Sequence, residues 1–157
     1  MAVRTSTWPV ERSSNFLGPE PDTFVGFLAR SLALLEREHP EAYARMCAAL
    51  ARRTVLLKVD DEAIELRFGK RRLRLAEPGV GGGQTVRAVT GRATILALVD
   101  GRLTLMDSVM QDRFEIFGGL DDLIAFHEGL MFYLHGAVRA PSFPALLRRF
   151  RTLETAR

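Results

Sequence analysis

His127 and Glu128 begin an HExxH pattern, in which two histidines one helical turn apart bind zinc. Position 131 is a methionine, so the second histidine of that pattern is missing. The next histidine, His135, would lie roughly 80° around a helix from His127 and about 12 Å along it, which is too far for one metal ion. We therefore expect these two histidines and His39 to be structural, and we expect no metal site.

Nucleophiles and acid–base pairs are also sparse. Cys47 lies on the apolar side of an expected helix, which is typical of a buried and unreactive thiol. The acidic run 60–62 lies in an expected turn, where solvation explains it, and the pair 121–122 suits the first turn of a helix. No Gly-x-Ser-x-Gly nucleophile elbow occurs. The sequence therefore predicts no catalytic residue, although it does not exclude an enzyme.

The glycine-rich stretch 77–84, EPGVGGGQ, invites comparison with phosphate-binding loops. Such a loop leads into a helix whose N-terminus faces the anion, and Walker-type loops end in Gly-Lys-Ser/Thr. Here the following residues, 84–87, are typical of a strand, and the lysine is missing. We interpret this stretch as a flexible hairpin loop between strands.

Composition and length indicate one globular domain. The chain has 157 residues, of which 47% are hydrophobic and 26% are charged, so it can bury a single core. One cysteine excludes an internal disulfide bond. No secretory signal and no apolar run of membrane-spanning length are visible, so we expect a cytoplasmic protein.

The positive charge is concentrated at the C-terminus. Residues 137–157 carry five arginines against one glutamate, whereas the other 17 basic and 18 acidic residues nearly cancel (22 − 5 and 19 − 1). A basic tail on a neutral body argues against nucleic-acid binding.

Hydrophobic periodicity predicts helices at both ends of the chain and strands in the middle. Helices are expected from residue 23 to His39-Pro40, at 41–52, 93–99, 104–111 and 120–136, and after Ser142. Strands are expected at 55–59, 63–68, 72–75, 85–89 and 113–117. This order predicts a loose segment 1–20, one α+β domain over 21–136, and a basic amphipathic helix within 137–157 that packs on or caps the domain.

The stretch 126–134 carries more large apolar residues than one helix face needs. After a core-facing stripe is assigned, Phe126, Phe132 and Tyr133 remain in excess, and the segment 103–110 adds two methionines. Flexible methionines beside aromatic residues suit a surface that adapts to variable shapes. Three explanations stay open: a larger filled core, a ligand cavity, or a subunit interface.

The segment 90–123 resembles the second half of a sterol carrier protein 2-like domain. The similar features are Thr90-Gly91, Leu98, Gly101-Arg102-Leu103, Val109-Met110, and the strand from Arg113 to Gly118. The resemblance extends more loosely over 24–136. Asp112 replaces a glycine of the family pattern, and Gly119 replaces its usual Asp or Asn.

This resemblance implies a five-stranded, mostly antiparallel sheet covered by helices, with an apolar tunnel between sheet and helices. A stand-alone bacterial member would bind a lipid or another apolar small molecule without a cofactor. The residues then expected to contact the ligand are Leu98, Leu105, Met106, Val109, Met110, Phe114, Phe117, Leu123, Phe126, His127, Leu130, Met131, Phe132, Tyr133 and Phe143. The tail helix would close the tunnel, while Arg148, Arg149 and Arg151 meet an anionic membrane surface.

The leading functional hypothesis is non-catalytic binding or carriage of an apolar molecule. A second is a pocket-containing enzyme or accessory protein of lipid- or polyketide-type biosynthesis, in which His127, Tyr133 or His135 would line the cavity. A third is a dimeric interaction module with a filled core.

Overall fold

The structure is a computed structural model that describes residues 23–79 and 83–155. The segment 1–20, which was expected to be loose, lies outside the described residues. Within the described part of the chain, no helix is both long enough and apolar enough to cross a lipid bilayer.

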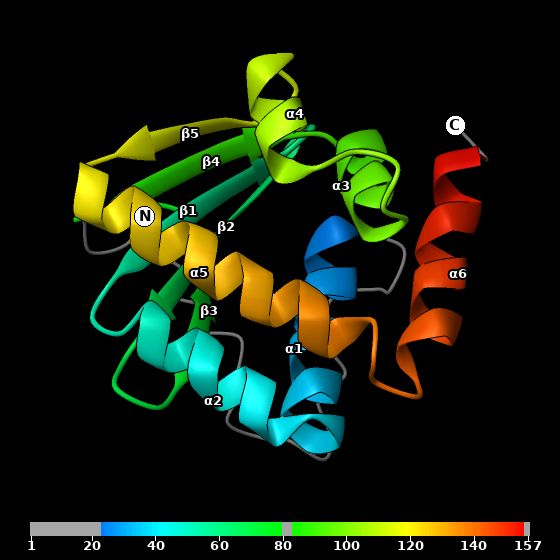
Figure 1. Ribbon diagram of the computed structural model, residues 1–157, viewed down its shortest axis with the longest axis horizontal. Coiled ribbons are helices and arrows are strands. Elements are labelled where there is room, and N and C mark those ends of the chain that lie inside the picture. Colours follow the sequence, from blue (N-terminus) through cyan, green and yellow to red (C-terminus); the bar gives the residue numbers. More distant parts are fainter. Residues whose placement is uncertain (1–22, 80–82, 156–157) are drawn as a thin grey trace, which may run out of the picture.

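Five strands form one mixed sheet in the order β3-β2-β1-β4-β5 (Figure 1). Their bounds are Thr54–Val59 for β1, Glu62–Phe68 for β2, Leu73–Ala76 for β3, Val86–Thr90 for β4 and Glu115–Gly118 for β5. Strands β1, β2 and β3 form the expected antiparallel meander, and β5 is antiparallel to β4. Only β4 and β1 run parallel among these pairs, with Val55 opposite Val86. The predicted five-stranded, mostly antiparallel sheet is confirmed.

Helices α1 (Phe24–Glu38), α2 (Pro40–Ala49) and α5 (Leu120–Ala137) pack on one face of this sheet (Figure 1). Thr23 caps α1, since its side chain accepts a hydrogen bond of 2.9 Å from the backbone N–H of Gly26. His39 separates α1 from α2, and Pro40 starts the second helix, as the sequence predicted.

Two short helices, α3 (Arg92–Val99) and α4 (Leu105–Met110), connect β4 to β5. The C-terminal helix α6 (Phe143–Thr155) lies beside α1 and α3 (Figure 1). Its buried side chains include Phe143 and Phe150, so the amphipathic tail predicted from the sequence is packed against the helical layer.

Two expected boundaries differ from the structure by more than one residue. Helix α2 ends at Ala49 rather than near residue 52, because Arg52 is left-handed (φ 66°) and its N–H donates to the carbonyl of Phe68. Strand β5 begins at Glu115 rather than at 113, because Arg113 and Phe114 both donate their N–H groups to the carbonyl of Ser108. In both cases the backbone departs from the expected helix or strand where its N–H groups bind a carbonyl outside that element.

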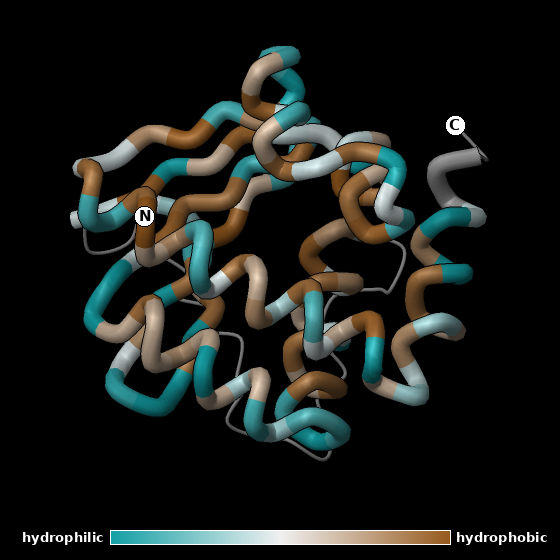
Figure 2. The backbone as a smooth tube through the Cα atoms, viewed as in Figure 1, coloured by the Kyte–Doolittle hydropathy of each residue, from teal (hydrophilic) through white to brown (hydrophobic). Residues whose placement is uncertain are grey.

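Figure 2 shows apolar residues along the strands and the helices that cover them, and polar residues on the connecting turns. The buried apolar residues of these elements form one core cluster. Helices α2 and α5 approach closely because α5 carries glycines at this contact. A Cβ atom on Gly136 would lie 2.6 Å from the Cβ of Ala42 and 2.6 Å from Leu35 Cδ1. A larger residue at this position would therefore push the two helices apart.

Glu65 is fully buried although it faces away from this core. Its carboxylate accepts hydrogen bonds from Arg67 (3.0 Å) and from the amide of Gln84 (2.6 Å) in the connection between β3 and β4. The N–H of Gly79 donates to the same carboxylate at 3.4 Å. Gly79 and Gln84, which lie near the two ends of the glycine-rich stretch, thus lie at the outer face of the sheet. The expected hairpin at 77–84 is wrong, because β3 and β4 are not neighbours in the sheet.

Candidate functional site

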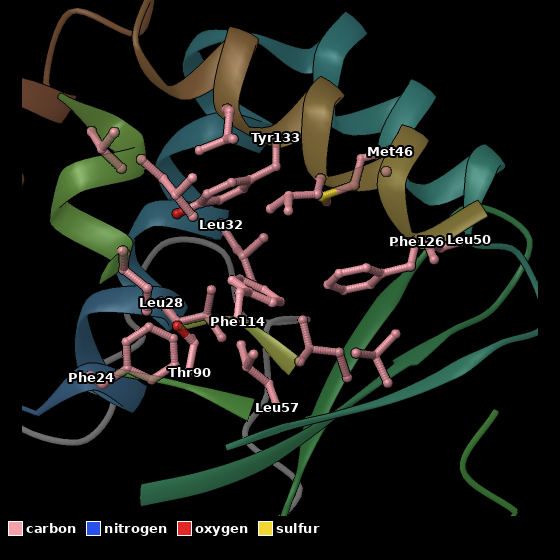
Figure 3. A pocket seen from close by; sticks show the side chains of 18 of the residues that line it. Phe24, Leu28, Leu32, Met46, Leu50, Leu57, Thr90, Phe114, Phe126 and Tyr133 are labelled. Atoms are coloured by element: carbon pink, nitrogen blue, oxygen red, sulfur yellow. The ribbon is translucent and has the colours of Figure 1, made fainter. Parts of the chain in front are cut away.

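An apolar cavity of about 110 Å³ lies between the sheet and the helices (Figure 3). Strands β1, β2 and β4, the residue that precedes β5, and helices α1, α2, α3 and α5 all contribute to its wall. The lining residues are Phe24, Phe27, Leu28, Leu32, Met46, Leu50, Val55, Leu57, Leu66, Phe68, Thr90, Ile95, Leu98, Val99, Phe114, Phe126, Gly129, Leu130, Tyr133 and Leu134.

The wall is apolar because each element turns its core-facing residues toward the cavity. Val55 and Leu57 alternate on β1, and the intervening Leu56 points to the opposite face of the sheet. On α1, Phe24, Leu28 and Leu32 follow a four-residue spacing, which places them on one side of the helix.

Thr90 and Tyr133 carry the only polar side chains among these lining residues. Thr90 Oγ1 donates a hydrogen bond of 2.9 Å to the carbonyl of Arg113. Tyr133 Oη lies 2.7 Å from Ser31 Oγ, which in turn donates to the carbonyl of Leu28 at 2.8 Å. Burial raises the pKa of Tyr133 to about 12, so this hydroxyl stays protonated over the physiological range.

A buried ion pair holds three elements together at the end of the cavity near Phe24. Glu62 of β2 accepts hydrogen bonds from the N–H groups of Phe24 (2.8 Å) and Val25 (3.3 Å) at the start of α1. The same carboxylate accepts a hydrogen bond of 2.7 Å from Arg92, whose side chain is 2% exposed. Asp60 accepts from the backbone N–H of Arg92 at 3.2 Å and thus caps α3.

These contacts correct one expectation from the sequence. The acidic run 60–62 was assigned to a solvated turn, but Glu62 belongs to β2 and binds the N-terminus of α1 and a buried guanidinium, while Asp60 binds the N-terminus of α3.

Helix α6 supports the cavity wall through aromatic contacts. Phe150 is stacked on Phe27 with ring centroids 4.2 Å apart, and the guanidinium of Arg92 lies 5.5 Å from the Phe150 ring centre. Arg151 makes two hydrogen bonds to Asp100, of 2.7 and 2.6 Å. Phe27 also lines the cavity, so α6 packs directly against a residue of the cavity wall.

The structure brings five of the fifteen predicted ligand-contact residues to the cavity wall: Leu98, Phe114, Phe126, Leu130 and Tyr133. The three from α5 lie four and three residues apart, as residues on one helix face do. Phe143 is buried but packs against Phe27 instead of lining the cavity.

The other predicted contact residues lie outside the cavity lining. Leu105, Leu123, Met131 and Phe132 are partly buried, whereas Met106, Val109, Met110, Phe117 and His127 are exposed. Helix α4 packs inward through Leu105 and Ser108, which leaves Met106 and Met110 69% and 75% exposed. On α5, Met131 and Phe132 flank the lining face because successive helical residues are rotated by about 100°.

Most of the wall comes from residues that the sequence analysis did not assign to a site. These include the inward residues of β1 and β2 and the apolar stripes of α1 and α2. Their alternation and helical spacing were visible in the sequence, but they equally fit a filled core.

Of the residues named for the enzyme hypothesis, Tyr133 lines the cavity, whereas the histidines and Cys47 are not among the lining residues. His127 and His135 are exposed on α5, and His39 caps α2 by accepting from the N–H of Ala42. Cys47 is fully buried, and burial raises the pKa of its thiol to about 11. Across residues 23–79 and 83–155, no three His, Cys, Asp or Glu side chains gather where they could hold a metal ion.

The arginines expected at a membrane surface are not equivalent. Arg148 and Arg149 are exposed on α6, whereas Arg151 is bound to Asp100.

Comparison with known protein families finds no matching family model, and comparison with curated protein sequences finds no match. Solved structures do share the fold. A protein described as "UbiJ-SCP2 Ubiquinone synthesis protein" superposes with a TM-score of 0.55 at 14% identity, over 78% of this chain and 97% of its own.

Two further structures are similar to a comparable extent. A sterol carrier protein 2 matches with a TM-score of 0.52 at 17% identity, over 73% of this chain and 95% of its own. The sterol carrier protein domain 2 of Helicoverpa armigera matches with a TM-score of 0.51 at 14% identity, over 78% and 94%. The protein therefore has the sterol carrier protein 2 fold, as the motifs in 90–123 predicted.

Proposed function

We propose that this protein, whose fold is that of sterol carrier protein 2 domains, binds a lipid or another apolar small molecule between its sheet and helices. The observation that carries the proposal is the cavity of about 110 Å³, whose lining residues are apolar except for Thr90 and Tyr133. The names of the two structurally similar sterol carrier proteins support the same class of ligand.

The size of the cavity limits what it holds in the described conformation. An apolar cavity of roughly 150 Å³ in another protein binds benzene, so about 110 Å³ admits a ring or a short chain. Micromolar affinity requires about 8 kcal/mol, and each buried methylene contributes about 0.8 kcal/mol before ordering costs. About ten methylenes are therefore needed, and we infer that the helices move apart to admit a ligand of that length.

Two neighbouring residues of β1 provide a matched test. Leu57→Trp places a larger side chain in the cavity, and Leu56→Trp places the same side chain on the opposite face of the sheet. A dansyl-labelled undecanoic acid would be titrated into the wild type and both variants, with circular dichroism to verify folding. Binding is expected for the wild type and Leu56→Trp and should be lost or strongly weakened for Leu57→Trp.

If the tryptophan at position 57 unfolds the protein, Leu57→Phe serves as the milder variant. Equal probe affinity in the wild type and in folded variants at both positions would place binding elsewhere on the molecule and refute the proposal. Native mass spectrometry of the purified protein gives an independent readout, because a retained ligand adds a releasable mass.

A further inference from the structure

A cleft of about 420 Å³ lies on the surface between α3, the loop that follows it and α6 (Figure 1). We call it the arginine cleft, and its lining residues are Ala93, Leu96, Ala97, Arg102, Leu103, Arg113 and Arg151. Helix α3 separates this cleft from the cavity. Ile95, Leu98 and Val99 of α3 line the cavity, and at about 100° per residue they lie on the opposite side of the helix from the α3 residues of the cleft. The arginine cleft is therefore a separate site.

Three arginines reach this cleft from three different parts of the chain. Arg102 lies in the loop between α3 and α4, Arg113 lies two residues before β5, and Arg151 belongs to α6. The side chains of Arg102 and Arg151 are 65% and 42% exposed, and Arg113 is exposed as well. Among the residues that the structure describes, no acidic side chain lines the cleft. A dissolved anion can therefore reach all three arginines.

One neighbouring carboxylate neutralises only part of this positive charge. Asp100 accepts two hydrogen bonds from Arg151, of 2.7 and 2.6 Å, and one of 3.2 Å from Arg102. The side chain of Arg113 makes no hydrogen bond or ion pair within residues 23–79 and 83–155. Three positive charges thus share one negative charge, and their mutual repulsion would be offset by a bound anion.

The available donors suit a phosphate ester. A guanidinium presents its N–H groups in a planar fork that matches two phosphate oxygens. All five N–H groups of Arg113 are available, and Arg102 uses only one nitrogen for Asp100. A phosphate monoester carries about −1.5 to −2 charge at pH 7, which matches the excess of positive charge in the cleft. Leu103 and the α3 residues add apolar surface for the organic part of such an ester.

We propose that the arginine cleft binds a small organic phosphate, whose phosphate group is held by the three arginines while its apolar part contacts Leu103 and α3. A volume of about 420 Å³ lies within the ordinary range of small-molecule sites. Because the cleft is concave, a soluble ester fits it better than the phosphates of a flat membrane surface. This inference goes beyond the proposed function, since it concerns a second site that is tested independently of the cavity.

Phenyl phosphate and inorganic phosphate are suitable probes, because both are dianions and only the first carries an apolar ring. Each would be titrated into the full chain at constant ionic strength and followed by nuclear magnetic resonance. Phenyl phosphate should bind with a dissociation constant of about 1 mM or lower, and inorganic phosphate about tenfold more weakly. A tenfold difference corresponds to roughly 55 Å² of apolar surface removed from water.

Arg113→Gln and Arg102→Gln should each weaken the binding of phenyl phosphate by about tenfold or more, because each removes charge-assisted hydrogen bonds. Arg149→Gln is the matched control. It removes the same charge from an exposed position of α6 that does not line the cleft, so the affinity should change by less than about twofold. Arg151 is retained in all variants because it also binds α6 to Asp100, and thermal unfolding verifies that each variant is folded.

The inference is overturned if phenyl phosphate does not bind the wild type, or if Arg149→Gln weakens binding as much as Arg113→Gln, which would indicate attraction by net charge alone. It is also overturned if Arg113 is needed only for binding to vesicles that contain phosphatidic acid. The dansyl-labelled acid reports on the cavity in the same samples. Displacement of this acid by phenyl phosphate would place the phosphate in the cavity and refute a separate site. Failure of phenyl phosphate alone would leave the proposed function intact.

Discussion

The contact between Glu62 and Arg92 allows a quantitative test of how the cavity end is held. Glu62 accepts three hydrogen bonds, from two backbone N–H groups of α1 and from Arg92, and its side chain is 18% exposed. Arg92 is 2% exposed, and its Nε and Nη1 atoms make no hydrogen bond to the described part of the chain. The carboxylate is therefore well satisfied, whereas the guanidinium depends on it.

This asymmetry predicts different costs for removing either partner. Glu62→Ala leaves a buried cation without its counter-charge and removes the acceptor of two N–H groups at the start of α1, and such changes cost about 3–5 kcal/mol. Arg92→Met retains an unbranched apolar stem against Phe150 and leaves Glu62 bound to two N–H groups and in contact with solvent. Its loss is one charge-assisted hydrogen bond, about 1.5–3 kcal/mol. The difference of about 2 kcal/mol corresponds to roughly thirtyfold in the folding equilibrium.

Urea unfolding followed by circular dichroism measures the free energy of unfolding of each variant. The comparison holds when the dependence of that free energy on urea concentration, the slope m, is the same in all variants. Glu41→Ala is the control, because its ion pair with Arg45 is exposed on α2 and should contribute only about 0.3–0.5 kcal/mol. If Arg92→Met is as destabilising as Glu62→Ala, the carboxylate is not the central group of this contact and the reasoning is refuted.

Three further predictions concern other parts of the fold. Gly136→Ala should destabilise the protein by about 1–3 kcal/mol in urea unfolding, and Ala42→Gly in the same chain should recover part of that loss, because the two Cβ atoms would clash. Arg151 holds the pKa of Asp100 below its usual range, so Asp100 contributes stability above its ordinary pKa of about 3.9 and loses it as the pH falls through the lowered value. Calorimetry should therefore show Asp100→Asn melting below the wild type at neutral pH, with the difference shrinking below about pH 4. Cys47, with a pKa near 11, should react with a thiol reagent at pH 8 only after unfolding, and a fast reaction of the native protein would contradict its burial.

Local patterns in the sequence were sufficient for most of the secondary structure. The proline after His39 and the hydroxyl of Thr23 marked helix ends because both act on adjacent backbone groups. Alternation identified β1 and β2 because one face of each strand is packed against the core. The parallel pairing of β1 with β4 could not be derived this way, because neither strand carries a local mark of its partner.

The cavity was harder to predict than the fold. On α5, the sequence analysis left Phe126 and Tyr133 outside the core-facing stripe, whereas in the structure both lie with Leu130 in the cavity wall. Helical spacing does not distinguish residues around a void from residues in a filled core. Met106 and Met110 were assigned to the site by their chemistry, yet α4 packs inward through Leu105 and Ser108 and leaves them exposed. The role of Glu62 depends on α1 and α3, which approach β2 only in the folded protein.

The strand order has a consequence for how the protein folds. The meander of β1, β2 and β3 joins neighbours in the chain and closes short loops, so it can form early. Strand β4 pairs with β1 only after the chain has passed through β2, β3 and the glycine-rich connection. Closure of this central parallel pair brings together distant segments and should limit the refolding rate. Until it forms, β1 presents an unpaired edge, and refolding at high protein concentration would expose that edge to intermolecular pairing.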